Sequence, residues 1–581
     1  MVDHDLVIRG GTVIDGTGTE GRITDVAVKD GRIAKIGQVA PSGARAIDAG
    51  GLVVSPGFID LHTHYDAQIF WDSTLSPACQ HGITTVIGGN CGLTFAPARP
   101  ADRDFITRLF ARVEAIPEKV LVAGVPFSWE SYAEMLDSVA ALDLGVNIGF
   151  LVGHSALRRA AMGEAASERA ATSQELEQMC RLLNDALAAG GMGFSTANVS
   201  TQVDGDGRPT PPNFAVHEEF VALAGVCSRY PGTSLEFIPN SFLAGFSDAD
   251  MELMADMSAA ANRPLNWNTP LINKAVQHLF ERQLSATDVA AKRGGKVVPL
   301  FSLQNGPMQM DFHNGYVFRA LPGWGWLFEL DVPARIDALK DPANRARLLK
   351  SLDDAGPGIA STVKDKWGAY YFNDPKNPDL AAFDGVPVRD VARDRGISDF
   401  DAACDIAIEA GLEVGLVRPS FDVQDEWTDR TRMELLKDPR IILGASDGGA
   451  HMDMIYGSDF PTRCLAELVR ERQIFSLEEM IRKFTDEPAR LYGLRDRGRL
   501  AVGAVADIAI FNPATVGAGP LRTVADLPGG GVRLKTEAIG MHHVLVAGEP
   551  LVSDGKLTDH RGGKLLRSGR DSETVLARAA A

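Results

Sequence analysis

Eight short apolar segments, separated by longer stretches of helical pattern, constrain this chain more than any other feature of its sequence. This alternation is typical of parallel strands joined by helices. The stretch Gln174 to Ala189, rich in leucine, alanine and glutamate, is one such helix. The pattern predicts an α/β fold, the (β/α)8 TIM barrel, with its active site at the carboxyl ends of the strands. A doubly wound open sheet is the alternative. The predicted strands span residues 52–61, 83–88, 146–152, 192–197, 234–239, 264–269, 296–302 and 440–445.

The two ends of the chain have a different pattern from the middle. Residues 5–55 are β-rich and punctuated by glycine, with a hairpin signal at Lys29-Asp30-Gly31-Arg32. The same pattern returns in residues 506–511 and 544–550. We therefore predict a small β domain built from residues 1–55 and 495–581, around a catalytic domain of residues 56–494.

A long insertion, at about residues 303–438, separates the last two predicted strands. It is rich in aromatic residues, among them Trp324, Trp326 and Trp367. Long insertions at this end of a barrel commonly form lids or pocket walls. A helical subdomain whose aromatic residues form its own core is an equally good interpretation.

Composition excludes several classes of partner. Of the 581 residues, 58 are basic and 76 acidic, giving a net charge of −18 without a long basic run. This argues against nucleic acid or an anionic membrane as the main partner. No apolar run reaches transmembrane length, and Met1-Val2-Asp3-His4-Asp5 lacks the basic and apolar regions of a signal peptide, so we expect a cytoplasmic protein. Its six scattered cysteines predict reduced thiols. A small-molecule substrate and a homo-oligomer are expected.

Two histidines follow the first predicted strand in Pro56-Gly57-Phe58-Ile59-Asp60-Leu61-His62-Thr63-His64. Side chains alternate along a strand, so His62 and His64 face the same side. Two imidazoles at one strand end form half of a metal site, which a carboxylate, a thiolate or water completes. The acidic Tyr65-Asp66 that follows favours a catalytic site over a structural pair.

The last predicted strand ends in Ser446-Asp447-Gly448, followed by His451. A divalent metal held by His62, His64 and Asp447 would leave positions open for water and substrate. Metal-activated water is a nucleophile near neutral pH, and Asp447 could pass its proton to a leaving nitrogen. The plainer interpretation of Asp447 is a cap on the following helix.

Other polar residues near the predicted strand ends are weaker candidates. Cys91 alone is more often a small buried hydrophobe. His154 is expected to orient substrate or to form structural hydrogen bonds. Candidates for contact with the substrate or for support of the site are His154, Glu236, Asn268, His313 and His451.

These motifs, with Gly82-Ile83-Thr84-Thr85-Val86 and a late segment at 499–507, resemble the amidohydrolase superfamily. Gly89-Asn90-Cys91-Gly92 and residues 152–158 resemble its D-aminoacylase (N-acyl-D-amino-acid deacylase) branch. The resemblance implies a metal-dependent barrel with a small β-sandwich, hydrolysing amide or other C–N bonds. It also implies that Cys91 is a metal ligand with His62, His64 and Asp447, and that Asp447 is the catalytic base.

The chain departs from this branch in two strands. The branch supplies one histidine from strand five and one from strand six, whereas residues 234–240 and 265–270 contain none. Glu236 could replace one of them through oxygen. We therefore predict one zinc-like ion per chain, with two as the alternative. The expected function is hydrolysis of an amide, cyclic amide or related C–N acyl bond. The alternative is a non-catalytic oligomeric scaffold that has lost part of its metal site.

Overall fold

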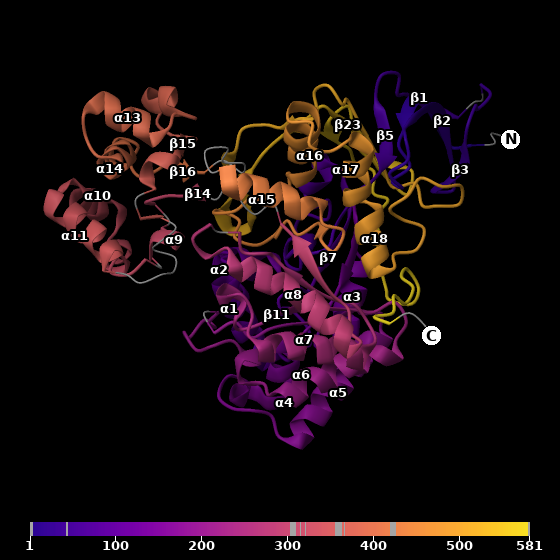
Figure 1. Ribbon diagram of the computed structural model, residues 1–581, viewed down its shortest axis with the longest axis horizontal. Coiled ribbons are helices and arrows are strands. Elements are labelled where there is room, and N and C mark those ends of the chain that lie inside the picture. Colours follow the sequence, from indigo (N-terminus) through magenta and orange to yellow (C-terminus); the bar gives the residue numbers. More distant parts are fainter. Residues whose placement is uncertain are drawn as a thin grey trace.

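The protein has an α/β fold whose parallel strands lie in the middle of the chain (Figure 1). Within the described part of the chain, no helix combines the length and apolarity needed to cross a membrane. All six cysteines are free, as predicted. The computed structural model describes residues 4–41, 44–200, 202–272, 274–302, 309–313, 315–319, 321–354, 363–364, 366–418 and 426–578.

Parallel pairing links the central strands in two runs. The first run is β6–β7–β8 and the second is β9–β10–β11–β12–β13–β17. Only Leu151 separates β8 from β9, and the Leu61 N–H donates to the Gly444 carbonyl at 3.2 Å, joining the ends of β6 and β17. The carboxyl ends of these strands therefore lie together. The strands are β6 (Phe58–Asp60), β7 (Ile83–Gly88), β8 (Asn147–Phe150), β9 (Val152–Gly153), β10 (Gly193–Ala197), β11 (Ser234–Ile238), β12 (Leu265–Asn268), β13 (Val297–Phe301) and β17 (Ile442–Leu443).

Helices connect these strands. The predicted helix over 174–189 is α5 (Ser173–Ala188), which begins with a capping box between Thr172 and Glu175. The others around the central strands are α1 (Arg103–Val113), α2 (Glu118–Gly124), α3 (Tyr132–Ala140), α4 (His154–Met162), α6 (His217–Val226), α7 (Asp248–Ala261), α8 (His278–Arg293), α15 (Glu426–Lys437), α16 (Phe460–Cys464), a π-helix (Leu465–Glu471), α17 (Leu477–Phe484) and α18 (Asp486–Tyr492).

A second, mixed sheet joins the two ends of the chain. Its order is β25–β24–β23–β18–β5–β1–β2–β3, with β4 beside β1. The predicted hairpin lies between β2 and β3, where Asp30 and Gly31 both have positive φ. The strands are β1 (Leu6–Val13), β2 (Arg22–Lys29), β3 (Arg32–Ile36), β4 (Arg45–Asp48), β5 (Val53–Pro56), β18 (Ile508–Phe511), β23 (Met541–Val546), β24 (Glu549–Ser553) and β25 (Lys556–Leu557).

The predicted strand over 52–61 is two strands that belong to different sheets. Residues of β5 pair with β1 and β18, whereas β6 pairs with β7. The chain crosses between the sheets at Gly57, where a Cβ atom would lie 2.2 Å from Oγ1 of Thr84. Only glycine allows this close approach.

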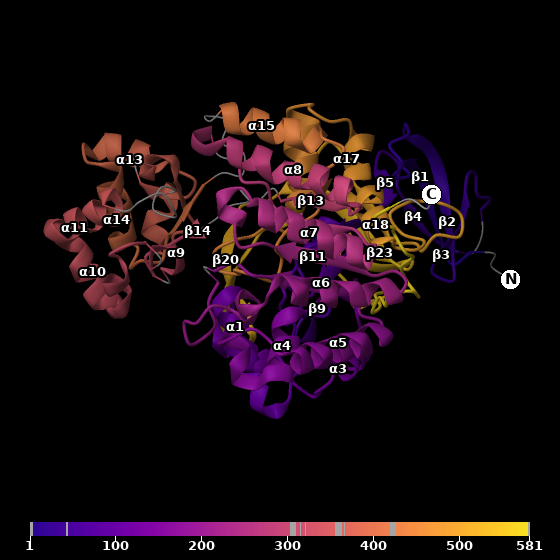
Figure 2. The same cartoon turned by 60° about the horizontal axis from the view of Figure 1, so that its bottom comes forward.

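The insertion has a hydrophobic core of its own, which contains Trp324 and Trp367 with ring centroids 6.0 Å apart. Its helices lie on the side of the molecule opposite β1, β2 and β3 (Figures 1 and 2). This matches the subdomain interpretation of these aromatic residues. The elements are β14 (Gln309–Met310), α9 (Tyr316–Arg319), α10 (Val332–Lys340), α11 (Pro342–Asp353), β15 (Tyr371–Asn373), α13 (Val388–Arg395), α14 (Asp399–Glu409) and β16 (Gly415–Val417).

A C-terminal hairpin connects the insertion to the rest of the protein. Arg522 pairs with Asp384 at 2.7 Å, and the Thr523 N–H donates to Asp374 at 2.8 Å. The Gln309 N–H also donates to the carbonyl of Met454, seven residues after Asp447. The remaining strands near this hairpin are β19 (Gly517–Ala518), β20 (Arg522–Leu527), β21 (Gly531–Lys535) and β22 (Ala538–Ile539).

Candidate metal centre

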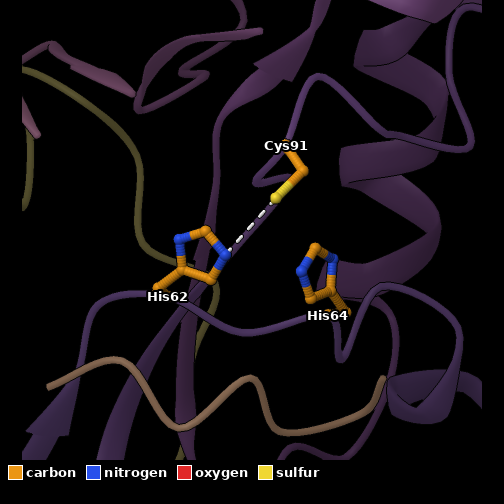
Figure 3. Close-up of side chains that lie close together, drawn as sticks. All are labelled: His62, His64 and Cys91. Atoms are coloured by element: carbon orange, nitrogen blue, oxygen red, sulfur yellow. Dashed lines mark hydrogen bonds between the residues drawn. The ribbon is translucent and has the colours of Figure 1, made fainter. Parts of the chain in front are cut away.

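His62 and His64 leave the end of β6 side by side, as the alternation predicts. Both are buried, and their ring centroids lie 5.3 Å apart (Figure 3). Thr63 points away from them, since its hydroxyl donates to the Ile87 carbonyl at 2.8 Å. The His64 N–H donates to the Gly448 carbonyl at 2.7 Å, which fixes this segment against the loop after β17.

Cys91 approaches the histidines from the turn after β7. Its Sγ lies 3.5 Å from His62 Nε2, and Figure 3 shows the thiol pointing toward the two rings. The ligand atoms of His62, His64 and Cys91 all lie within 4.8 Å of one another. The thiol therefore faces a cluster of metal-binding groups and is not simply a small apolar side chain.

Asp447 reaches the same cluster from the loop after β17. Its Oδ1 lies 3.2 Å from His64 Nε2 and 3.6 Å from His62 Nε2. The next helix, α16, begins at Phe460 with Asp459 at its N-cap. Asp447 therefore does not cap this helix.

Three separations between these atoms are those expected of ligands that share one tetrahedral ion. Zinc lies about 2.0–2.3 Å from nitrogen, oxygen or sulfur ligands, so adjacent ligand atoms should be roughly 3.3–3.6 Å apart. Asp447 Oδ1 lies 3.2 Å from His64 Nε2 and 3.6 Å from His62 Nε2, and Cys91 Sγ lies 3.5 Å from His62 Nε2. Imidazole, thiolate and carboxylate are also ligands that zinc accepts.

Two further carboxylates lie beside the cluster. Glu114, just after α1, places Oε2 3.6 Å from His64 Nε2 and 4.0 Å from His451 Nε2. Asp66 accepts the Gly89 N–H at 3.1 Å. Asp66 lies two residues after His64, so its position beside the site could be predicted from the sequence. No motif near Glu114 predicts that it belongs to the site.

Glu236 projects from β11 to the turn that carries Cys91. Its side chain is fully buried, and Oε2 accepts the Cys91 N–H at 3.0 Å. Its Oε1 has no hydrogen-bond partner within the described ranges. The register places Glu236 beside Ser195 of β10 and Asn266 of β12.

The other predicted residues lie in varied surroundings. His154 is buried, with Nε2 2.8 Å from Glu219 and Nδ1 2.9 Å from the Thr196 hydroxyl. The His451 N–H donates to the Glu114 carbonyl at 2.6 Å. Asn268 ends β12 and is 9% exposed, whereas His313 is exposed on the insertion.

Burial and mutual repulsion perturb the pKa values of these groups. Burial raises the pKa of Glu236 to about 8 and that of Glu114 to about 7. Burial also lowers the pKa of His62, to about 3. For His64 burial acts in the same direction, but the Glu114 and Asp447 carboxylates outweigh it and raise the pKa to about 10. Perturbed groups of this kind gather at functional sites.

Ser195 holds the turn that presents Cys91. Its hydroxyl accepts the Gly92 N–H at 3.2 Å and donates to the Gly89 carbonyl. Cys91 between them has a positive φ of 54°, an uncommon conformation for a residue other than glycine. The two bonds therefore stabilise the conformation that directs the thiol at His62.

The Ser195→Ala variant is expected to bind metal about 10–100-fold more weakly, because groups that orient metal ligands have effects of this size. Titration calorimetry measures the affinity, and loading with cobalt shows whether the thiolate-to-metal absorption band persists. Ser234→Ala, in the neighbouring strand β11, is the control. Equal affinity in the Ser195 variant and the parent protein would contradict a positioning role.

Comparisons with known proteins identify relatives over nearly the whole chain. The sequence profile of the amidohydrolase family matches residues 45–552. D-aminoacylase of Alcaligenes xylosoxydans xylosoxydans is 27% identical, covering 97% of each chain. N-acyl-D-glutamate deacylase of the same organism is 28% identical, covering 97% of this chain and 96% of the relative. A D-aminoacylase crystal structure matches with a TM-score of 0.63 at 24% identity, covering 97% of this chain and all of that one. The resemblance to the D-aminoacylase branch is confirmed.

Proposed function

This chain belongs to the amidohydrolase family, and we propose that it hydrolyses the amide bond of a small N-acyl-amino-acid-like molecule. Its family and its deacylase relatives make it a metal-dependent hydrolase of C–N bonds other than peptide bonds. The scaffold alternative is therefore not proposed. The observation that supports the site best is the cluster of His62, His64 and Cys91, with the Asp447 carboxylate 3.2 and 3.6 Å from the two imidazoles.

These four residues would hold a divalent metal, zinc in our proposal. When bound, the metal supplies a Lewis acid that polarises the scissile carbonyl and makes water a nucleophile at neutral pH. Asp447 then takes the proton of the attacking water on its carboxylate and delivers it to the leaving nitrogen. His64 Nε2 and Asp447 Oδ1, which lie 3.2 Å apart, would both be ligand atoms of this metal.

The arrangement of the chain around this site extends the proposal. We propose that the parallel strands close into a (β/α)8 barrel, supported by the bond from Leu61 to Gly444 and by the Asp447 N–H donating to the His62 carbonyl. The small β-sandwich domain would comprise residues 1–55 and 495–581. A lid function for residues 303–438, a cytoplasmic location and a homo-oligomer remain proposals.

The residues outside the four ligands have separate proposed roles. His451 and Asn268 are candidates for contact with the substrate. His154 is proposed to stabilise the structure around the site without contacting the substrate, because both of its ring nitrogens already have hydrogen-bond partners. For His313, on the insertion, contact with substrate remains a proposal.

Hydrolysis of a defined panel tests this function. Metal-loaded protein is incubated with N-acyl-D-amino acids, their L-enantiomers and cyclic amides, and released amine or opened ring is measured. We expect turnover of at least one N-acyl compound, loss after chelation and recovery when zinc is restored. Activity that survives complete metal removal, or loaded protein inactive on every compound, would overturn the proposal.

A further inference from the structure

The loop that carries Asp447, which we call the catalytic loop, has no regular secondary structure of its own. Its residues, 444–459, join β17 to α16 and are all described by the structure, and they contain no helix or strand. Asp447 and His451 have positive φ angles of 59° and 47°, which are uncommon for residues other than glycine. Such conformations persist where surrounding contacts hold them. The position of the Asp447 carboxylate therefore depends on what packs against this loop.

The first half of the catalytic loop is held by the segment that carries the two histidines. The Asp447 N–H donates to the His62 carbonyl at 3.1 Å, and the His64 N–H donates to the Gly448 carbonyl at 2.7 Å. Gly449 packs directly against the same segment, since a Cβ atom there would lie 2.6 Å from the carbonyl carbon of His64. These contacts attach the loop to the central strands.

The second half of the catalytic loop is held by two segments outside the central strands. The N–H of Gln309, in β14 of the insertion, donates to the Met454 carbonyl at 2.7 Å. The N–H of Leu534, in β21 of the C-terminal hairpin, donates to the Met452 carbonyl at 2.6 Å. β14 lies where the insertion meets the rest of the protein, close to β20 (Figure 2). The loop is therefore bonded to the insertion and to the hairpin.

Apolar side chains of the catalytic loop reinforce this attachment. Met454 is 8% exposed and belongs to the hydrophobic core of the insertion, and Ile455 packs against that core. Tyr456 lies in a smaller cluster with Leu521 and Leu534. The core of the insertion thus extends into the loop that carries the proposed base.

Gln309 connects these three parts of the molecule. Its Oε1 accepts a hydrogen bond from Asn373 Nδ2 of β15 at 2.9 Å, and its Nε2 donates to the Thr523 hydroxyl of β20 at 3.4 Å. Gln309 is buried, and Gly415 of β16 packs against it, since a Cβ atom there would lie 2.2 Å from Oε1. The side chain bonds to the insertion and the hairpin, while the backbone N–H bonds to the catalytic loop.

We propose that Gln309 is a positioning residue, through which the insertion and the C-terminal hairpin hold the catalytic loop and set the position of Asp447. This inference rests on the proposed function, because Asp447 is the proposed base. Gln309 acts through Met454, seven residues after Asp447. A small displacement of a catalytic group lowers the rate of the chemical step strongly, even when its cause lies far from the reacting atoms. The insertion thereby contributes to catalysis without having to move as a lid.

The Gln309→Met variant tests this role. Methionine has a similar length and removes both side-chain hydrogen bonds while leaving the backbone N–H. We expect faster amide hydrogen exchange in residues 447–458, measured by mass spectrometry, because a segment with fewer anchoring contacts opens more readily. In zinc-loaded protein, kcat on the best substrate of the panel should fall about 10- to 100-fold, with KM changed by less than about twofold.

The matched control is Arg345→Met, which weakens the insertion at a different place. Arg345 pairs with Asp401 and Asp405 inside the insertion, at 2.9 and 2.7 Å. This change leaves the contacts of Gln309 intact, so hydrogen exchange in the catalytic loop and kcat should remain those of the parent protein.

A second variant keeps the test decisive if Gln309→Met fails to fold, as judged by its melting curve. Asn373→Ala removes the hydrogen-bond donor to Gln309 Oε1 from the neighbouring strand β15. It carries the same expectations for hydrogen exchange and for kcat, with smaller effects because the bond to Thr523 remains.

The outcomes separate this inference from the proposed function. Unchanged hydrogen exchange in the catalytic loop of Gln309→Met, or faster exchange with the kcat of the parent, would overturn the positioning role. An equal loss of kcat in Arg345→Met would also overturn it, because any weakening of the insertion would then suffice. A parent protein inactive on every compound would overturn the proposed function, whereas the exchange measurement would still decide whether Gln309 holds the loop.

Discussion

Replacing Asp447 with asparagine is expected to lower kcat/KM by about three orders of magnitude while preserving the fold. Asparagine has nearly the same shape, so its oxygen can remain near His64 Nε2, where the Asp447 Oδ1 lies at 3.2 Å. An amide cannot accept the proton of the attacking water, and general acid–base groups typically contribute about 10²–10⁴-fold. Steady-state kinetics on the best substrate of the panel, with a melting curve, measure both effects.

Asp453→Asn is the matched control because it makes the same change six residues later in the same loop. The electrostatic neighbour of Asp453 is Asp311 of the insertion, so we expect activity within about threefold of the parent. Near-normal turnover by Asp447→Asn, in protein with its normal metal content, would refute the assignment of Asp447 as the base.

The proposed metal ligands His62, His64 and Asp447 could be predicted from the sequence because each follows a strand end, whereas the role of Cys91 was implied only by the family resemblance. His62 and His64 alternate with Thr63, and Asp447 and Cys91 follow strands that the apolar pattern located. Glu114 could not be found in this way. It lies at the end of α1, and its burial depends on contacts with His451, more than 300 residues away.

The role of Glu236 depended on strand register, which the sequence could not determine. Shifting the pairing register of a strand by one residue moves each of its side chains to the opposite face of the sheet. The structure pairs Glu236 with Ser195 and directs its carboxylate to the Cys91 N–H.

The role of the aromatic residues of the insertion was also ambiguous in the sequence, because a hydrophobic core and a pocket wall have the same composition. The side chains of Trp324 and Trp367 are buried in the hydrophobic core of the insertion.

Metal binding is expected to stabilise the protein more strongly as the pH rises from about 6.5 to 8. Without metal, Glu236 has its pKa raised to about 8, so the folded state retains a proton that the unfolded state has released. The folded state also retains the proton of His64, whose pKa is raised to about 10. Because the folded state binds more protons in this range, the free energy of unfolding of the metal-free protein falls with rising pH.

Bound metal reverses this trend, because its ligands must be deprotonated and its affinity therefore rises with pH. At a free metal concentration of 1,000 times Kd, the added stability is about 4 kcal/mol. Melting temperatures of zinc-loaded and chelator-treated protein should therefore diverge across this range. In Glu236→Gln the metal-free protein should lose less stability with rising pH, because one of the groups that keep a proton in the folded state is gone. A constant difference between the loaded and metal-free melting temperatures would show that these buried groups are not coupled to metal binding.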